Sequence, residues 1–393
     1  MFSLKDRIIY YLLFPWGHFA SDLPGGALFI LAPAIGVAWG LTPAQIGFII
    51  TAHAIGAGLG YMPSGIMGDR FERRGVVLLF MLGWAAVGYI AASFSWSYGV
   101  LILLIAFAGF GDGGWHPAAT GTMVQKMPEK RGFALGIHLV GGILAEVIGP
   151  VTAGVLLTIL DWQEVLRLSV IPLIFTFFIF CITWPKILRA KDTKISLADF
   201  ASLIKPWKSQ QGINMIFVMI FYSMAYIALL AMTPLYLQDD LGYSSVFAGV
   251  TFAIMMVTGG LTAPLIGRVS DRFNRKMVNG IALIIGVFGL GLLAFSSLAF
   301  FIVVGAALAA GAWTGLRPSL LADAVEITGK RESTSLGIIF VFMDGIGALG
   351  AVFAGIVGYA DLRYAFLFAG ILALLAVICL SFNLFTKHRF PIN

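Results

Sequence analysis

The chain has 393 residues, of which 60% are hydrophobic and only 11% are charged, whereas an average soluble domain carries about 25% charged residues. A bilayer core about 30 Å thick takes roughly 20 apolar residues per helix, so about a dozen spans would use nearly the whole chain. The composition therefore predicts an integral membrane protein and excludes a large soluble domain. The net charge of +6 does not call for nucleic acid as a partner, because membrane loops carry such an excess.

Apolar segments bounded by Pro, Gly or charged residues follow one another along the chain. We expect spans at residues 8–38, 44–66, 76–95, 98–124, 133–158, 165–185, 212–238, 245–267, 277–297, 298–323, 334–358 and 363–385. The first run lacks a cleavage-site pattern, so we expect a span there rather than a removed signal peptide. The pattern predicts an N-terminal six-helix bundle (1–185), a cytoplasmic linker (186–211) and a C-terminal six-helix bundle (212–393).

Lys and Arg are distributed unevenly between the two sides of these spans. With both termini in the cytoplasm, all 25 Lys and Arg residues except Arg167, Arg317 and Arg363 fall in cytoplasmic segments. This is the asymmetry that the positive-inside rule describes. We therefore expect a multi-pass protein of a bacterial inner (plasma) membrane, with both termini cytoplasmic.

One loop sequence occurs in each half of the chain. Residues 65–74 read GIMGDRFERR, and residues 267–276 read GRVSDRFNRK. A second matched pair places Pro117 and Lys130-Arg131 against Pro318 and Lys330-Arg331. Both pairs are separated by about 200 residues, and matched segments at one period indicate a duplicated unit.

The repeated loop resembles the signature of the major facilitator superfamily, G-x-x-x-D-[RK]-x-G-[RK]-[RK], except that Glu72 and Asn274 replace the second glycine. The resemblance covers the whole chain and implies an all-α fold of twelve transmembrane helices in two pseudo-symmetric bundles that work by alternating access. It also implies a cytoplasmic gate. The gate residues would be Gly65, Asp69, Arg70, Arg73, Arg131, Asp271, Arg272, Arg275 and Arg331. The alternative, that these charges only set the topology, does not explain the matched Gly and Asp.

Several ionisable residues lie inside the predicted spans, where a charge costs several kcal/mol and by default indicates function. His18 and Asp22 are spaced i, i+4, and Asp112 and His116 repeat this spacing on the fourth span. A carboxylate and an imidazole so placed can hold or pass a proton. With Glu146, these are the predicted proton-coupling residues. The alternative is that each imidazole only satisfies its neighbour within the bundle.

Aromatic and further ionisable residues in the spans are candidates for a substrate site, because such side chains suit an amphiphilic organic molecule. The candidates are Trp16, His53, Trp115, His138, Tyr222, Tyr226, Trp313, Arg317 and Asp344. Arg317 would bind an anionic substrate or, alternatively, snorkel to the surface. For each aromatic residue, packing within the bundle is the alternative.

Two short motifs refine the resemblance. Gly17-His18-x-x-x-Asp22 together with Gly114-Trp115-His116-Pro117 resembles the fosmidomycin-resistance branch of the superfamily, which implies proton-driven efflux and multidrug resistance. The arginine motif R-x-x-x-G of the fourth span is absent. Asp112 with His116 is therefore the expected local substitute in a proton relay.

A third motif lies in the fifth span. The run Gly149-Pro150-Val151-Thr152-Ala153-Gly154 resembles the antiporter signature G-P-x-x-G-G, with Ala153 in place of a glycine. It predicts a gating role for Gly149, Pro150 and Gly154. Ordinary close packing of helices explains the same residues.

The combined pattern predicts a proton-coupled antiporter that exports a small drug-like or metabolite molecule. The alternative is a proton symporter that takes up an organic acid or other metabolite, and a third possibility is a transporter-like membrane receptor. The sequence contains no phosphate loop and no H-E-x-x-H motif, so neither ATP drive nor an enzyme is expected.

The expected partners are protons, the small organic substrate and the lipid bilayer. Cys181 and Cys379 match no metal or disulfide spacing, and we expect neither a metal nor a cofactor. One chain contains both halves, so a monomer would suffice. The second half lacks counterparts of Asp22, Asp112 and Glu146, so we expect proton coupling in the first half and substrate selectivity in part in the second.

Overall fold

The computed structural model describes residues 4–127, 129, 131–189, 205–328 and 339–386. Eleven helices in this part of the chain are long and apolar enough to cross a membrane. A shorter apolar helix, Val341–Val357, occupies the position of the predicted eleventh span, whose first residues, 334–338, lie outside the described residues. The predicted all-α membrane fold is confirmed.

The elements of the first half run from α1 to η3. They are α1 (Leu4–Arg7), η1 (Ile8–Leu13), α2 (Phe14–Trp39), α3 (Pro43–Arg70), α4 (Arg74–Ala92), α5 (Tyr98–Lys126), α6 (Arg131–Leu156), α7 (Trp162–Thr183) and η3 (Trp184–Lys186). Those of the second half are η4 (Lys205–Lys208), α9 (Gln210–Leu235), η5 (Tyr236–Asp240), α10 (Ser245–Arg272), α11 (Arg275–Phe295), α12 (Ala299–Thr328), η6 (Val341–Ile346), α14 (Leu349–Val357) and α15 (Arg363–Thr386).

The repeated signature is mostly helical rather than a loop. Helix α3 continues to Arg70 and helix α10 to Arg272, past the predicted ends of these spans, so only two or three residues connect each to the next helix. Asn274 caps helix α11, because its side chain accepts hydrogen bonds from the backbone N–H groups of Lys276 and Met277, at 3.0 and 3.3 Å. A glycine there would leave these N–H groups without that acceptor.

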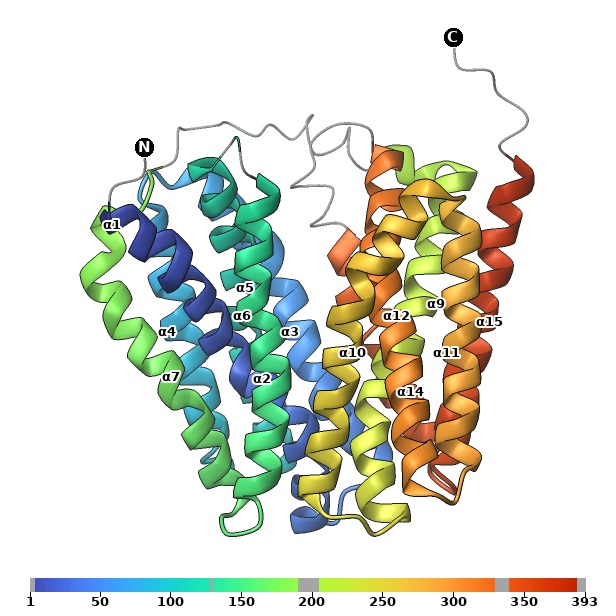
Figure 1. Ribbon diagram of the computed structural model, residues 1–393. Coiled ribbons are helices and arrows are strands. Elements are labelled where there is room, and N and C mark those ends of the chain that lie inside the picture. The colour runs from blue at the N-terminus through green and yellow to red at the C-terminus, as the bar shows by residue number, and fades with distance from the viewer. Residues whose placement is uncertain (1–3, 128, 130, 190–204, 329–338, 387–393) are drawn as a thin grey trace. The chain divides into compact units, whose positions relative to one another are not determined.

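The chain forms two compact units (Figure 1). The first unit comprises Met1–Leu41, Phe48–Lys194 and Leu237–Ala253, and the second comprises Thr42–Gly47, Ile195–Tyr236 and Ile254–Asn393. Each unit is therefore drawn mainly from one half of the sequence, with short exchanged segments. The predicted division at residues 185 and 212 stays a prediction.

In the first unit, helix α2 packs along α6 and α7, and helix α4 packs along α5 and α7. Glycines bring α3 and α5 into direct backbone contact. A Cβ atom on Gly56, Gly109 or Gly113 would lie 1.9, 2.2 or 2.4 Å from a backbone atom of the opposite helix. The dense glycines of α5 thus permit close packing, and they draw the side chains of α3 and α5 together.

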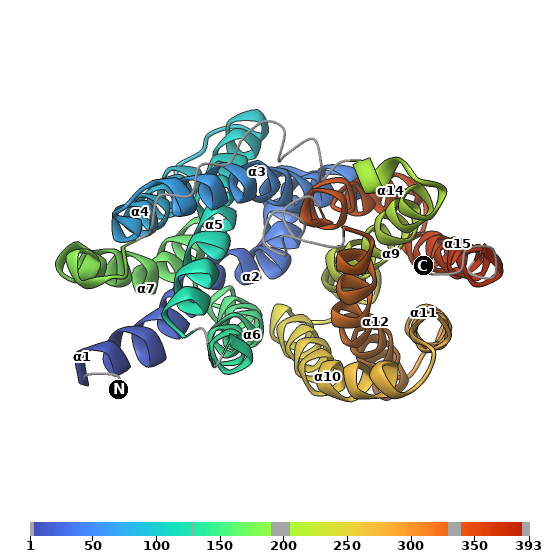
Figure 2. The same cartoon turned by 90° about the horizontal axis from the view of Figure 1, so that it is seen from above.

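In the second unit, α9 packs on α14 and α15, and α11 packs on α12 and α15; Figure 2 shows these helices end-on. Two fully buried aromatic residues connect them. Tyr222 donates from its hydroxyl to the carbonyl of Trp313 at 2.7 Å, and the Trp313 indole donates to the carbonyl of Leu283 at 3.2 Å. These bonds hold α9, α11 and α12 in fixed register.

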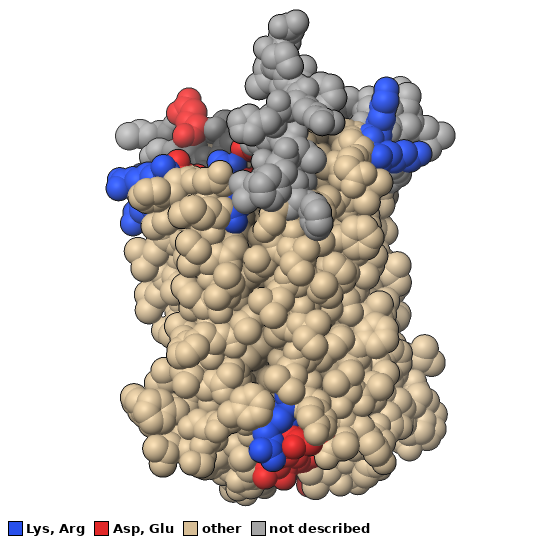
Figure 3. Space-filling view, turned by 90° about the vertical axis from the view of Figure 1, so that its right-hand side faces the viewer, with Lys and Arg blue, Asp and Glu red and all other residues tan. Residues whose placement is uncertain are grey.

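The face shown in Figure 3 carries charged side chains in two places. Lys and Arg gather at one end together with some Asp and Glu, and a smaller mixed group lies at the other end. Between them the described residues present an uncharged band. Such a band is what a membrane-embedded surface requires, because charge is expensive in the hydrocarbon core.

Candidate functional site

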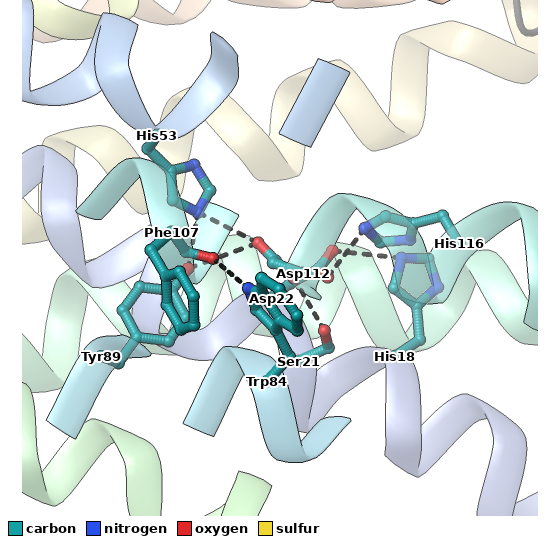
Figure 4. A network of polar contacts seen from close by, with 9 residues as sticks. All are labelled: His18, Ser21, Asp22, His53, Trp84, Tyr89, Phe107, Asp112 and His116. Atoms are coloured by element: carbon teal, nitrogen blue, oxygen red, sulfur yellow. Dashed lines mark hydrogen bonds and ion pairs between the residues drawn. The ribbon is translucent and has the colours of Figure 1, made fainter. Parts of the chain in front are cut away.

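Polar side chains from α2, α3, α4, α5 and α6 meet inside the first unit, and Figure 4 shows those from α2 to α5. We call this group the histidine–aspartate cluster, and it consists of His18, Ser21 and Asp22 of α2, His53 of α3, Tyr89 of α4, Asp112 and His116 of α5, and His138 of α6. Asp112 is buried and Asp22 is half-buried. Their carboxylates therefore depend on neighbouring groups rather than on bulk water.

Asp22 contacts two imidazoles. The Nε2 atom of His18 lies 3.1 Å from Asp22 Oδ2, which forms the pair expected from the i, i+4 spacing. The Nε2 atom of His116 lies 3.4 Å from Asp22 Oδ1. His116 lies on the same helix face as Asp112, but it contacts an aspartate on another helix. Asp22 is therefore the central carboxylate of this part of the cluster.

The hydrogen bonds of His18 fix where its protons lie. Its Nδ1 atom is 2.8 Å from the carbonyl oxygen of His138, and because a carbonyl only accepts, Nδ1 must carry hydrogen. Its Nε2 atom then faces a carboxylate oxygen of Asp22. Two bare lone pairs at this distance would repel, so a hydrogen bond here requires a proton on either Nε2 or Oδ2.

Asp112 is the second carboxylate of the cluster. Its Oδ1 atom accepts from Ser21 Oγ at 2.7 Å, while its Oδ2 atom lies 3.2 Å from His53 Nε2 and accepts from the Tyr89 hydroxyl at 3.3 Å. His53 Nε2 and the Tyr89 hydroxyl are 2.6 Å apart. Imidazole and phenol can both donate and accept, so a proton can be redistributed within this triangle.

The two halves of the cluster are close to one another. Ligand atoms of Asp22, Asp112 and His116 all lie within 4.8 Å. Two carboxylates this close in apolar surroundings cannot both be ionised without a compensating positive charge. A cluster with this geometry can hold protons, and its charge would change if they left.

The same donor atoms have the chemistry of a metal site. His18, His116 and His138 also offer nitrogen atoms within 4.8 Å of one another. These three histidines are far apart in the sequence and converge in the fold. The His18–Asp22 and His53–Asp112 contacts, at 3.1 and 3.2 Å, have the distances of direct hydrogen bonds. We assign no metal here.

A second ionic site lies in the second unit. Arg317 of α12 donates from one terminal nitrogen to both carboxylate oxygens of Asp344 in η6, at 2.8 and 2.9 Å. The arginine thus points to a partner inside the protein. The hydroxyl groups of Tyr226 and Thr314 are hydrogen-bonded at 2.9 Å. The ring of Tyr222 lies parallel to that of Tyr226, with 6.1 Å between the ring centres. We call Arg317, Asp344, Tyr222, Tyr226 and Thr314 the arginine–aspartate site.

The remaining candidates occupy varied positions. Trp115 is fully buried against Phe14 and Phe180, and Trp313 is fully buried as well, so both pack in the bundle. Trp16 is 40% exposed. Glu146 lies on an exposed face of α6, close enough to act electrostatically on His18.

The gate residues of the second half form an ionic network. Arg275 lies 3.6 Å from both Asp271 and Asp323 and also bonds Glu326, whereas Arg272 is exposed. Asp323 and Glu326 were missed because they stand at the end of the tenth span, outside the repeated motif.

The gate residues of the first half are only partly described. The side chains of Asp69, Arg70 and Arg131 lie outside the described part, as does all of Arg331. Gly65 faces Pro117, which a Cβ atom would approach to 3.7 Å, and the Arg73 guanidinium lies 5.9 Å from the centre of the Trp184 ring. The predicted latch stays a prediction.

Helix α6 runs through the predicted gating motif without interruption. A Cβ atom on Gly149 would lie 2.9 Å from the carbonyl of Leu23, and the Gly154 carbonyl accepts from Ser245 Oγ at 2.9 Å. These contacts are ordinary close packing around Pro150. A gating role for the motif stays a prediction.

Comparison with known proteins places these features in a family. A model described as Major Facilitator Superfamily matches residues 16–261 and 215–392. The 4-hydroxybenzoate transporter PcaK of Pseudomonas putida is 26% identical, over 91% of this chain and 87% of that protein. A probable sulfoacetate transporter, SauU of Cupriavidus necator, is 26% identical over 66% of this chain, which spans 65% of that protein's length.

Solved structures agree on the fold. A bacterial homolog of the human lysosomal transporter Spinster, in an inward-facing and unoccupied conformation, superposes with a TM-score of 0.80, with 17% identity and complete coverage of both chains. The family model, the named relatives and the shared fold lead to one conclusion: the chain belongs to the Major Facilitator Superfamily, and it is a membrane transporter rather than an enzyme.

Proposed function

We propose that the protein is a proton-coupled symporter that takes up a small organic anion. The observation that carries this proposal is the histidine–aspartate cluster, in which His18 Nε2 lies 3.1 Å from Asp22 Oδ2. Coupling requires a group that is charged in one step of the cycle and neutral in another. Carboxylates and imidazoles within a membrane span have this property.

Two observations support an organic anion as the substrate. The relatives described above are named for 4-hydroxybenzoate and sulfoacetate, both of which are organic acids. Arg317 supplies a guanidinium group inside the second unit, and guanidinium geometry matches carboxylate and other oxyanions. These observations favour uptake over the export of drug-like molecules.

Export remains the competing direction. The named relatives do not support the narrower resemblance to the fosmidomycin-resistance branch. The inner-membrane location, the cytoplasmic termini and the monomeric state belong to the same proposal. They are supported by the distribution of Lys and Arg and by the presence of both halves in one chain.

A transport assay separates the directions. The purified protein is reconstituted in liposomes, and accumulation of radiolabelled 4-hydroxybenzoate, sulfoacetate and a panel of other small acids is measured under opposite pH gradients. A symporter accumulates its substrate when the exterior is acidic, whereas an antiporter accumulates it in vesicles with an acidic lumen. The readout does not depend on the orientation of the protein. Binding without transport under either gradient would favour a receptor.

Single substitutions connect the assay to the cluster. Asp22→Asn and Asp112→Asn should abolish accumulation driven by the gradient but leave substrate exchange between the two sides, because exchange needs no net proton release. Accumulation that continues unchanged in both variants, or that needs no proton gradient in the wild type, would overturn the proposal.

Asp361→Asn is a matched control. This carboxylate lies outside the spans, and hydrogen bonds from the backbone N–H and the side chain of Arg363, at 2.9 and 3.1 Å, lower its pKa. A group with a lowered pKa stays ionised at and above the usual range for aspartate and protonates only in stronger acid. Its removal should leave the pH profile of transport unchanged.

A further inference from the structure

We propose that Asp344 is a second proton acceptor. The anionic group of the substrate would replace Asp344 as the partner of Arg317, and Asp344 would take up a proton at that step. The second unit would then bind one anion and one proton together. This inference rests on the proposed uptake of an organic anion, and it adds a coupling step in the half of the chain where sequence predicted only selectivity.

The geometry of the Arg317–Asp344 pair allows such an exchange. Both carboxylate oxygens of Asp344 accept from the same terminal nitrogen of Arg317, at 2.8 and 2.9 Å. A guanidinium group binds an oxyanion more strongly through a fork of two nitrogens. An incoming carboxylate or sulfonate that adopts this fork can therefore compete with Asp344.

The pair is accessible, and the chain around Asp344 has room to adjust. The side chains of Arg317 and Asp344 are 29% and 19% exposed. A Cβ atom on Gly345, the next residue, would meet no heavy atom within 4 Å. Asp344 also lies in the π-helical turn η6. This conformation is rare in proteins, but where it occurs it is often at a functional site.

Charge balance explains why a proton must enter. The pair is neutral as it stands, and adding an anion to Arg317 would leave Asp344 as an uncompensated carboxylate within a membrane-embedded unit. Protonation of Asp344 removes that charge. The bound state is then Arg317 with the anion, next to a neutral carboxyl group, so each anion brings one proton.

The described elements that pack near Asp344 do not place a second positive charge beside its carboxylate. Helix α9, which packs on η6, carries Tyr222 and Tyr226 and no charged residue. Element η4 approaches through Trp207, whose ring centre lies 6.2 Å from that of Phe342, and its Lys205 and Lys208 are exposed. Among the described residues, Arg317 is the cation that pairs with Asp344.

The rest of the substrate has a neighbouring place on the same helix face. Thr314 and Arg317 are three residues apart on α12, so their side chains lie on one side. Tyr226 already contacts Thr314 through its hydroxyl group at 2.9 Å. A small anion held by Arg317 would therefore place its remaining polar or aromatic part beside Tyr226 and Thr314.

The test is substrate binding as a function of pH. Binding of 4-hydroxybenzoate, and of sulfoacetate with its permanently ionised sulfonate, is measured on the purified full-length protein between acidic and alkaline buffers. Wild-type affinity should fall by about tenfold for each pH unit over which the protein must take up one proton with each anion. Asp344→Asn should bind with an affinity that no longer depends on pH and should lose gradient-driven accumulation.

Arg317→Gln should weaken binding by roughly thirtyfold in Kd at every pH, and Asp361→Asn should behave as the wild type. Thermal unfolding of each variant checks that it is folded. The same pH slope in Asp344→Asn and in the wild type, or wild-type affinity in Arg317→Gln, would overturn the inference. If only Asp22→Asn and Asp112→Asn fail to alter transport, the coupling role proposed for the histidine–aspartate cluster fails while this inference stands. Failure of the wild type to bind either anion would overturn both.

Discussion

The two units concentrate different chemistry within the same kind of scaffold. The first unit gathers two carboxylates and several imidazoles, with contacts of 3.1 to 3.4 Å between His18, Asp22 and His116. The second unit pairs one arginine with one aspartate beside tyrosine and threonine hydroxyl groups. Protons are best held by groups that titrate, and an oxyanion is best held by one that stays charged.

The difference suggests a division of work between units that derive from one duplicated sequence. The repeated signature is retained in both halves, but the residues that differ between them carry the chemistry. By our proposal, the cluster of the first unit stores protons and the site of the second unit recognises the anion. By our further inference, the second site also adds one proton step. Substitutions in each unit should therefore have distinct effects.

The largest expected effect is on binding and comes from the second unit. Arg317→Gln should weaken anion binding by about 2 kcal/mol or more, or roughly thirtyfold in Kd, because it removes a charge-assisted hydrogen bond. It also leaves Asp344 without its partner and should lower the thermal stability. Adding Asp344→Asn should restore stability but not binding. Recovery of binding in the double variant would contradict the role given to Arg317.

A substitution in the first unit should affect coupling more than binding. His18→Asn can keep a donor near the His138 carbonyl, which His18 Nδ1 contacts at 2.8 Å, but it removes the Nε2 atom that faces Asp22. We expect a displaced pH optimum of uptake and little change in Kd for the anion. The pH–rate profile in liposomes is the measurement. A profile identical to that of the wild type would remove His18 from the proton pathway.

A smaller effect should follow from crowding the cluster without changing its chemistry. A Cβ atom on Gly142 would lie 2.6 Å from His18 Nε2 and 3.3 Å from Asp22 Oδ2, so Gly142→Ala should push the imidazole away from the carboxylate. Uptake should fall. Gly136→Ala is the control on the same helix, because its Cβ atom would meet nothing within 4 Å. Equal uptake by both variants would contradict the predicted geometry.

The smallest effects should come from the two departures from the family signature. Asn274→Ala removes the N-cap of α11 and should cost about 1 kcal/mol of stability. Glu72→Gly removes an exposed pair with Arg189 at 3.0 Å and should cost less than about 1 kcal/mol. Thermal unfolding measures both, with transport unchanged. A large transport defect in either variant would indicate a gating role instead.

Sequence predicted the fold well, because composition, charge asymmetry and a repeated motif act over the whole chain. The His18–Asp22 contact could also be expected, since residues spaced i, i+4 meet on one helix. Ser21 and Tyr89 could not be singled out. They are ordinary residues of apolar helices, and their contacts with Asp112 depend on how helices α2, α4 and α5 pack.

Other parts of the site depend on distance in three dimensions alone. Nothing in the sequence links Arg317 to Asp344, which belong to separate elements. Their predicted roles as separate substrate contacts become one ion pair in the structure. The site roles themselves stay predictions until transport is measured.

The most direct test of proton coupling is the movement of protons with substrate. Liposomes containing the protein and a pH-sensitive dye receive an inward gradient of 4-hydroxybenzoate or sulfoacetate, with no initial pH difference and with the membrane potential clamped. Symport predicts that the lumen becomes acidic as the anion enters, and that Asp22→Asn abolishes this acidification. Anion entry with no change in luminal pH, or with the lumen becoming alkaline, would contradict proton-coupled uptake.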